Sequence, residues 1–197
     1  MWQQWMPAVR ITLAMTVLTG LIYPALVTGI AQVLFPEQAD GSLIVVNDRV
    51  IGSELIGQSF TRPEYFHSRP SAAGDGYDAT ASGGSNLGPT SSKLLDRVKK
   101  SVDAYRAANP DTDLQVPADA VLASASGLDP HITPDNAMQQ ASRVAKARGV
   151  EPARILELVL QMQEAPDFGV LGEPRVNVLR LNLALDKQFP APAASDI

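Results

Sequence analysis

A stretch of 26 residues without a charged side chain, Ile11 to Pro36, constrains this chain more than any other feature. Seventeen of the 25 residues from Ile11 to Phe35 are apolar. As a helix, the stretch is about 39 Å long, which exceeds the roughly 30 Å of a bilayer's hydrocarbon core. Trp2 and Trp5 precede it, where aromatic side chains contact the headgroups. We therefore expect one transmembrane helix over residues 11–35.

A cleaved signal peptide is the alternative, because Gly29 and Ala31 place small residues at the −3 and −1 positions of a cleavage site. The apolar stretch before Gly29 is longer than the usual h-region of about 7–15 residues, so a retained anchor fits better. Arg10 precedes the stretch and acidic Glu37 and Asp40 follow it, which favours a cytoplasmic N-terminus. The expected organisation is a cytoplasmic segment 1–10, a membrane helix 11–35, an extracytoplasmic domain 37–189 and a mobile tail 190–197.

Small and weakly polar residues recur every four positions along this stretch: Thr12, Thr16, Gly20, Pro24 and Thr28. Such a ridge lets a second helix approach closely, and Thr hydroxyls can hydrogen-bond across the contact. Because Pro24 lacks a backbone N–H, we also expect a kink close to it. We predict that the ridge contacts a partner's membrane helix; the simpler alternative is that a single-pass anchor merely tolerates these residues.

Cysteine is absent from the 197 residues, and histidine occurs only as His67 and His131. This composition excludes disulfide frameworks, Cys-ligated zinc, iron–sulfur clusters and thiol nucleophiles. No metal site or bound cofactor is therefore predicted for this chain. Residues 37–197 carry 15 basic and 21 acidic side chains, a net charge of −6. A general nucleic-acid-binding surface is not expected, since phosphate neutralisation needs a positive excess.

Residues 37–197 have the size of one domain, and their patterns predict an α+β fold. Two apolar runs, Leu43–Val46 and Val50–Gly52, flank the turn residues Asn47–Asp48 and predict a β-hairpin. Leu55–Phe60 is expected to extend that sheet. The fold class is thus an α+β soluble domain that follows a single N-terminal transmembrane helix.

Capping residues and apolar periodicity predict three helices in this domain. The first follows the hydroxyls of Thr90–Ser92 and runs to about Ala108, with a solvated basic surface of Arg97, Lys99, Lys100 and Arg106. The second extends from Thr133 to Gly149. The third opens at Glu151 and buries a face of Ile155, Leu156, Val159 and Leu160. The segment Val176–Leu185 fits both a strand and a helix.

The segment from Ser68 to Ser91 contains five Gly, five Ser and four Ala among 24 residues. Loops of this length inside a domain are usually functional or disordered. Within it, Ala79–Gly83 is echoed 44 residues later by Ala123–Gly127. Two similar entries into helices, with backbone N–H groups forming an anion-binding nest, are one interpretation. The candidate functional loop consists of Ser82, Gly83, Gly84, Ser85, Asn86 and Gly88.

Known catalytic and phosphate-binding patterns match this loop poorly. Pro89 and Thr90 stand where a P-loop requires Lys and Ser or Thr. A hydrolytic triad would use Ser82 with His67 or His131 as the base, and with a carboxylate from Asp75, Asp78 or Asp129. Ser82 lacks a G-x-S-x-G elbow, and both histidines are more simply explained as hydrogen-bonded structural residues.

Several ordered motifs run from about residue 8 to 187: Gly20–Pro24, Arg69–Ser71, Ser82–Pro89, Ser124–Ile132, Arg143–Arg148, Gly172–Val178 and Leu181–Asp186. Together they resemble the C subunit of the Kdp potassium-transporting ATPase. Such a series in one order is far more specific than any single motif. The resemblance leaves out the Pro- and Ala-rich tail after Phe189.

This resemblance implies a bacterial inner-membrane complex with a potassium-selecting, channel-like subunit and an ATP-hydrolysing P-type subunit. The chain would be a single-pass, non-catalytic accessory subunit, needed for assembly and activity, that raises the ATP affinity of the hydrolysing subunit like a chaperone. ATP and potassium would be handled by the complex. The extracytoplasmic location expected for residues 37–189, and their lack of a phosphate motif, argue against direct nucleotide contact by the domain. The alternative is a membrane-anchored or secreted hydrolase that uses the Ser82 loop.

Overall fold

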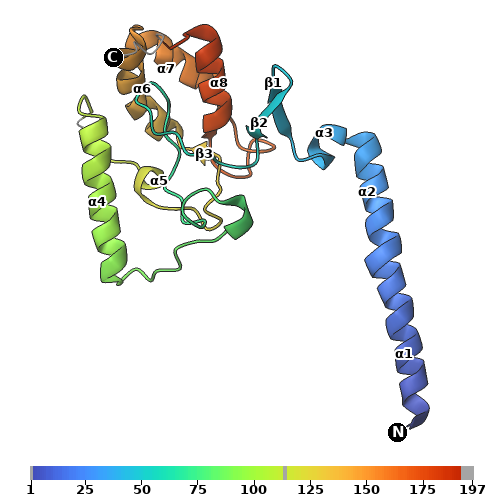
Figure 1. The fold of residues 1–197 in the computed structure, drawn as a ribbon. Helices are drawn as coiled ribbons and strands as arrows, with labels where there is room; N and C mark the ends of the chain where they lie inside the picture. The colour runs from blue at the N-terminus through green and yellow to red at the C-terminus, as the bar shows by residue number, and fades with distance from the viewer. Residues whose placement is uncertain (1, 113–114, 192–197) are drawn as a thin grey trace. The chain divides into compact units, whose positions relative to one another are not determined.

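A computed structural model describes residues 2–112 and 115–191. It divides the chain into two compact units, residues 1–53 and 54–197 (Figure 1). The side chain of Trp2, expected at the headgroup level, lies outside the described residues, as does most of the predicted tail, residues 192–197. The first unit holds the long N-terminal helix, and the second holds a mixed helix and small-sheet domain, as predicted.

The N-terminal helix consists of α1 (Trp2–Val17), η1 (Leu18–Ile22) and α2 (Tyr23–Leu34), followed by the short α3 (Pro36–Ala39). Its stretch Gln4–Leu34 is long and apolar enough to cross a membrane, and none of its residues is buried. At 1.5 Å per residue these residues extend about 47 Å. The helix thus begins well before the predicted first residue, Ile11.

The irregularity expected near Pro24 takes the form of the π-helical segment η1, just before it. The backbone N–H of Tyr23 donates to the carbonyl oxygen of Leu18, five residues back. In an α-helix, each residue is rotated by about 40° around the helix axis from the residue four positions before it. A π turn holds more residues per turn and so reduces this rotation. The segment η1 therefore makes the exposed ridge from Thr12 to Thr28 run more nearly along the helix axis.

The predicted hairpin is present as β1 (Leu43–Val46) and β2 (Arg49–Ser53), which pair antiparallel. Asn47 and Asp48 both adopt positive φ, 51° and 61°, as a two-residue hairpin turn requires. The extension of this sheet by Leu55–Phe60 is wrong, because that segment forms no strand. Gly57 instead donates its N–H to the carbonyl of Leu128, at 2.8 Å, in the second unit's own fold.

The second unit contains five α-helices, α4 (Ser92–Ala108), α5 (Ala118–Val121), α6 (Pro134–Arg148), α7 (Pro152–Gln161) and α8 (Val178–Gln188), among its described residues. Its sheet has the antiparallel order β3 (His131–Ile132), β5 (Arg175–Asn177) and β4 (Gln163–Glu164). A short 3₁₀ turn, η2 (Ala79–Ala81), lies in the long loop. The core gathers between α6, α7, α8 and β5, around Val144, Ile155, Leu158, Val176 and Leu181.

Helix α6 begins and ends as its capping residues predict. Thr133 accepts the backbone N–H of Asn136 with its hydroxyl, and Gly149 ends the helix in the left-handed conformation at φ 66°. The expected face of α7 is partly wrong: Leu158 is buried, while Leu160 is 60% exposed.

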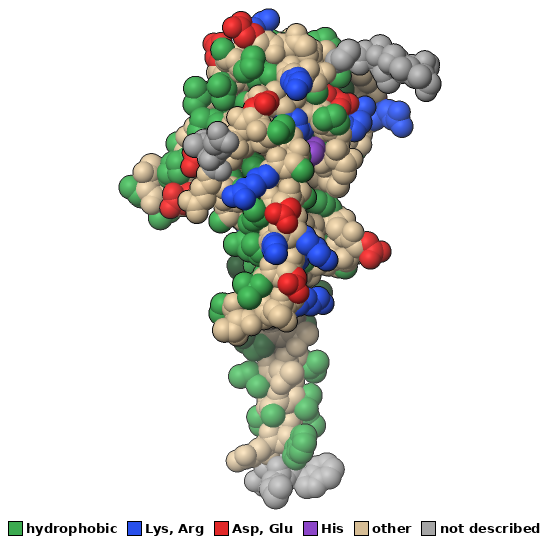
Figure 2. All heavy atoms as spheres, turned by 90° about the vertical axis from the view of Figure 1, so that its left-hand side faces the viewer, with side chains coloured by type: hydrophobic (Ala, Val, Ile, Leu, Met, Phe, Trp, Pro, Cys, Tyr) green, Lys and Arg blue, Asp and Glu red, His purple; other side chains and the backbone are tan. Residues whose placement is uncertain are grey.

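Helix α4 has the predicted span but not the predicted hydroxyl cap. The Ser91 side chain makes no capping bond, and the N–H groups of Leu94 and Leu95 bond to the Ser91 carbonyl instead. No α4 residue is buried, so its apolar face is only half covered. Figure 2, viewed from the α4 side of Figure 1, shows basic and acidic side chains intermingled on this face. This pattern agrees with the predicted solvated surface.

The ambiguous C-terminal segment contains both predicted structures in succession. Strand β5 ends at Asn177, and α8 begins directly at Val178. The Asn177 side chain caps the helix by accepting the N–H of Arg180 at 3.1 Å. The alternation of apolar and polar residues therefore corresponds to the strand at the start of the segment, and the helical spacing of apolar residues corresponds to α8.

Candidate functional site

The two segments that echo each other in sequence pack against each other in space. We call residues 82–84 and 125–127 the small-residue junction. Gly83 donates its backbone N–H to the carbonyl oxygen of Ser126 at 2.8 Å, and the Ser82 hydroxyl donates to the same oxygen at 3.0 Å. The Gly83 N–H is therefore already used, and the predicted anion-binding nest is wrong at this position.

Close backbone approach explains the small residues of the junction. A Cβ on Gly84 would lie 3.0 Å from the carbonyl oxygen of Ala125. One on Gly127 would lie 2.8 Å from the carbonyl oxygen of Gly83 and 2.6 Å from the backbone nitrogen of Ala73. Gly127 also has φ 69°, a region that side-chain-bearing residues rarely adopt.

The remaining members of the candidate loop also make local contacts. The Ser85 hydroxyl accepts a hydrogen bond from Nη2 of Arg97 on α4, at 3.2 Å. The Gly88 carbonyl accepts the N–H of Ser91 at 3.0 Å and so leads the chain into that helix. Asn86 has a positive φ of 48° between them. This loop therefore connects the junction to α4.

A third segment, Arg69–Ser71, completes the junction. The Ser71 hydroxyl donates to the carbonyl oxygen of Gly127 at 2.7 Å and accepts the backbone N–H of Tyr77 at 2.7 Å. The phenol of Tyr77 donates in turn to the carbonyl oxygen of Arg69. One serine thus ties the start of the long loop to the second echo.

Asp129 carries the negative charge next to the junction. Its carboxylate lies 2.6 Å from Nη1 of Arg69, and it accepts the backbone N–H of His131 at 3.0 Å. Partial burial alone would raise the pKa of Asp129, but hydrogen bonds from His131 and Arg69 and the Arg69 charge outweigh it and lower the pKa to about 2. A carboxylate this acidic stays ionised at neutral pH and is a weak general base.

An ion-pair network extends from Asp129 across the small sheet. Its charged members are Glu54, Arg69, Asp129, Glu164, Asp167, Arg175 and Arg180. The ring of His131 lies between Asp129 and Glu164, 3.4 Å from the first carboxylate and 3.9 Å from the second. Glu164 is the branch point, with carboxylate oxygens 3.1 Å from Arg175 and 3.6 Å from Arg180. These side chains are partly exposed, so each pair contributes modestly, and the network chiefly fixes the geometry of β3, β4 and β5.

The described residues do not assemble the hydrolytic triad. The Ser82 hydroxyl bonds to a carbonyl rather than to an imidazole, and Asp78 accepts from the Thr80 hydroxyl at 2.6 Å. The Nε2 atom of His67 lies 3.1 Å from the carbonyl oxygen of Arg62, within hydrogen-bond distance. Burial, followed by the charge of Arg143, lowers the pKa of His67. His67 is therefore a hydrogen-bonded structural residue, as its simpler interpretation predicted.

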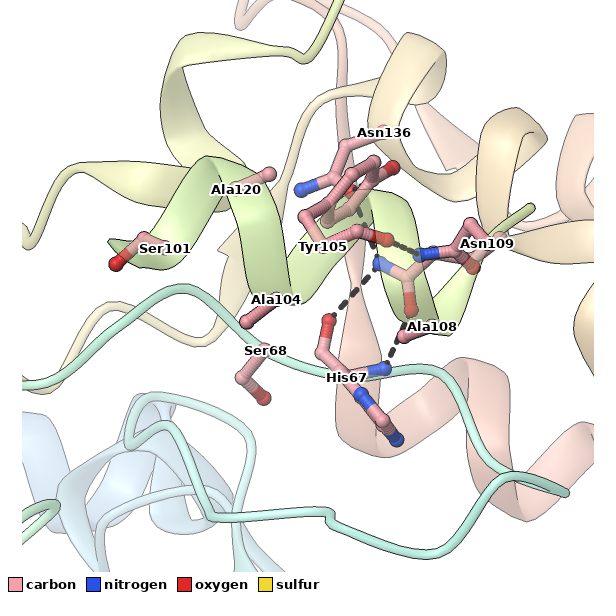
Figure 3. Close-up of a pocket in the computed structure, with 10 residues that line it drawn as sticks. His67, Ser68, Ser101, Ala104, Tyr105, Ala108, Asn109, Ala120 and Asn136 are labelled. Atoms are coloured by element: carbon pink, nitrogen blue, oxygen red, sulfur yellow. Dashed lines mark hydrogen bonds between the residues drawn. The ribbon is translucent and has the colours of Figure 1, made fainter. Parts of the chain in front are cut away.

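A pocket of about 230 Å³ lies between α4, α6 and the chain around His67 (Figure 3). The Tyr105 hydroxyl donates to Oδ1 of Asn136 at 3.1 Å, and the Gln140 amide donates to the same oxygen at 2.9 Å. Burial, and then the charge of Asp119, raises the pKa of Tyr105, so its hydroxyl stays protonated. These polar side chains already bond to one another, and the wall of the pocket offers ordered hydrogen bonding rather than a reactive group.

Two arginines of α6 bind a strap of chain, residues 62–68, that sequence reasoning did not recognise. Nη1 of Arg143 donates to the Pro63 and Tyr65 carbonyls, at 2.6 and 2.9 Å. Arg148, whose side chain is buried, donates to the Glu64 carbonyl at 2.8 Å. Burial lowers the pKa of Arg143 to about 10, which still leaves it charged. The only sequence signal for these roles was the Arg143–Arg148 motif.

Comparison with known proteins gives the family. The sequence model of the family described as KdpC, K⁺-transporting ATPase, c chain, matches residues 5–187. The chain belongs to the KdpC family. It is 56% identical to the Potassium-transporting ATPase KdpC subunit of Myxococcus xanthus over 197 residues, 99% of this chain and 93% of that protein. It is 54% identical to the subunit of that name in Koribacter versatilis (94% and 95%) and 56% identical to that in Rhodospirillum rubrum (93% and 95%).

As a KdpC-family chain, this protein is a subunit of a potassium-transporting ATPase. Its described residues contain one apolar helix, at the N-terminal end, that is long enough to cross a membrane. The motifs that carry the resemblance converge in the structure. Arg69–Ser71, Ser82–Pro89 and Ser124–Ile132 meet at the junction, and Arg143–Arg148 holds the strap. The Asp186 carboxylate bonds to Arg148 at 2.8 Å. These motifs thus stabilise the KdpC-family domain.

Proposed function

We propose that this chain is a non-catalytic accessory subunit of a high-affinity, ATP-driven potassium uptake complex in the inner membrane of a bacterium. Its partners there are a potassium-selecting, channel-like subunit and an ATP-hydrolysing P-type subunit, which carries the catalytic residues. The observation that carries this proposal is the family match over residues 5–187, which covers the apolar helix and the domain together. The Ser82 hydroxyl, bonded to a backbone carbonyl, gives the alternative hydrolase no support.

The proposed topology places the N-terminus in the cytoplasm and the domain outside it. Arg10 lies on one side of the most apolar stretch, and Glu37 and Asp40 lie on the other, so the positive-inside rule favours this orientation. The exposed ridge from Thr12 to Thr28 then contacts a membrane helix of a partner subunit. Its small side chains permit close packing, and η1 brings them nearer to one line along the axis.

The accessory role concerns ATP only indirectly. The family resemblance implies a chaperone-like subunit that raises the ATP affinity of the hydrolysing subunit. A domain outside the cytoplasm does not meet cytoplasmic ATP, so we propose that it acts through contacts with its partner subunits. Among the described residues, neither the junction nor the lining of the pocket beside His67 contains the lysine that a P-loop requires.

Purification of the whole complex tests the assembly. The chain, carrying an affinity tag, is purified from its native membrane in mild detergent, and the associated subunits and potassium-stimulated ATPase activity are measured. We expect two larger membrane subunits, and activity that falls when this chain is deleted from the cell. Recovery of the folded chain alone, as a monodisperse species, contradicts the proposal.

A reporter fused to the C-terminus tests the topology separately. Alkaline phosphatase folds and becomes active outside the cytoplasm, whereas green fluorescent protein fused at the same place reports a cytoplasmic end. We expect an active phosphatase fusion and a dark fluorescent fusion. The reverse pattern contradicts the proposed orientation and removes the objection to direct ATP contact by the domain.

A further inference from the structure

The loop that connects β4 to β5 carries three strongly exposed apolar side chains. Phe168 is 94% exposed, Val170 80% and Leu171 58%. Scattered single apolar residues on a surface are ordinary, whereas three exposed on one five-residue loop are not. The Asp167–Leu171 loop, as we call it, is therefore a candidate contact surface.

Hydrogen bonds hold this loop in one conformation. Asp167 and Leu171 exchange both backbone bonds, at 2.8 and 2.9 Å, and Gly169 donates its N–H to the Pro166 carbonyl at 2.9 Å. Arg175 on β5 fixes the base of the loop through a 3.2 Å ion pair with Asp167. The exposed side chains thus project from a preorganised loop, which reduces the entropy lost on binding.

Phe168 has an unusual backbone conformation, which the hydrogen bonds of the Asp167–Leu171 loop hold in place. Its φ is 53°, in the left-handed region that favours glycine, and its ring touches little of this chain. Such backbone conformations cluster at functional sites, and aromatic side chains are enriched in the cores of protein interfaces. The loop pays a conformational cost to present an aromatic ring to solvent.

The charge around the loop distinguishes between its possible occupants. Residues 163–175 contain three carboxylates, Glu164, Asp167 and Glu173, and one guanidinium, that of Arg175. Arg175 pairs with Glu164 and Asp167, and Arg180 pairs with Glu54 and Glu164. Counted together with Glu173, these side chains keep a net charge of −2, so the surface around the loop lacks the excess of Lys and Arg by which membrane-surface segments bind anionic lipid headgroups. An apolar pocket with a basic rim, on a protein surface, complements this loop in both shape and charge.

We propose that the Asp167–Leu171 loop docks on another subunit of the potassium-transporting ATPase, with Phe168 inserted in an apolar pocket that has a basic rim. This inference rests on the proposed function, because the partner is a subunit of the same complex. Phe168 is the central anchor, and the exposed Glu173 next to the loop is the carboxylate that the basic rim would contact.

Photo-crosslinking in the assembled complex tests the contact directly. Phe168 is replaced by p-benzoylphenylalanine in the full chain, and the same amino acid replaces Leu160, which is 60% exposed on α7, as the matched control. Irradiation of native membranes is expected to produce an adduct with a partner subunit from position 168, at a yield well above that from position 160. An adduct with lipid, an adduct with a second copy of this chain, or a yield no higher than the control overturns the proposal.

A second measurement uses dissociation of the purified complex in detergent. Phe168→Ser is expected to speed the release of this chain about tenfold or more, as the loss of an aromatic anchor does, whereas Phe168→Leu and Leu160→Ser have little effect. If the unsubstituted chain purifies with its partners and Phe168→Ser leaves the release rate unchanged, the docking proposal fails while the proposed function stands. If the unsubstituted chain does not purify with an ATPase subunit, the proposed function itself fails.

Discussion

The small-residue junction and the Asp167–Leu171 loop are both irregular in backbone, and they are nearly opposite in chemistry. The junction is made of Gly, Ser and Ala, and the described contacts of Ser82 and Gly83 are made within the chain. The Asp167–Leu171 loop presents Phe168, Val170 and Leu171 outward. The long Gly- and Ser-rich segment therefore packs against the rest of its own domain, whereas a short loop carries the exposed apolar side chains.

The largest effect is expected from Gly127→Ala. The new Cβ would meet the backbone of Ala73 at 2.6 Å and of Gly83 at 2.8 Å, at a φ of 69°. Left-handed strain of about 1–2 kcal/mol and overpacking of about 1–3 kcal/mol together predict a loss of about 3 kcal/mol in the free energy of unfolding. Thermal unfolding of the full chain in detergent, followed by circular dichroism, should show a midpoint lower by about 6–12 °C.

The matched control is Gly169→Ala in the Asp167–Leu171 loop. Gly169 has φ 76°, yet a Cβ there meets nothing within 4 Å. Only the left-handed strain remains, about 1–2 kcal/mol. Equal losses for the two variants would mean that close packing does not distinguish the junction from the loop.

Asp129→Asn is expected to have the next largest effect. The substitution removes the ion pair with Arg69, and the expected loss at pH 7 is about 1–2 kcal/mol after allowance for solvent screening. Because the folded pKa of Asp129 is lowered to about 2, its stabilisation is present above pH 4 and is lost as the pH falls from about 4 to 2. The difference in unfolding midpoint between the two proteins should therefore shrink over this range. A difference that stays constant down to pH 2 contradicts the assignment, and exposed Asp75→Asn serves as the control.

Local signals in the sequence predicted those elements whose causes are local. The charge-free run predicted the long helix, the Asn47–Asp48 pair predicted the hairpin turn, and Thr133 and Gly149 predicted both ends of α6. These signals act over a few residues, so one sequence reveals them.

Contacts between distant segments escaped prediction. Ser82 and Ser126 are 44 residues apart, and Arg143 and Pro63 are 80 apart, so no periodicity joins them. The echo of small residues was visible, but its physical meaning, mutual backbone approach, depends on a pairing that only the fold supplies. Phe168 likewise resembles a core residue until its exposure is known.

Ser82→Ala should have a small effect on stability and none on activity. It removes one partly exposed hydrogen bond to Ser126, worth about 0.5–1 kcal/mol, and leaves the Gly83 bond in place. The midpoint of thermal unfolding should fall by about 1–4 °C, while the potassium-stimulated ATPase activity of the complex stays unchanged. Ser124→Ala, which removes an acceptor for the Gly127 N–H at 2.9 Å, is a suitable control. A tenfold loss of activity specific to Ser82→Ala, at unchanged stability, would restore a catalytic role for the loop.

Phe168→Ser should have the smallest effect on the isolated chain. The side chain is 94% exposed, so its loss should change the free energy of unfolding by no more than about 0.5 kcal/mol. Yet the same variant is expected to leave the complex about tenfold faster, because an interface anchor acts only when its partner is present. Gly127→Ala should show the converse. Its unfolding midpoint should be lower, while the folded variant should leave the complex at the rate of the unsubstituted chain. The unfolding midpoint and the release rate, each measured for both variants, decide whether the junction stabilises the fold and the Asp167–Leu171 loop stabilises the assembly. If the two regions shared one role, each variant would change both the midpoint and the release rate.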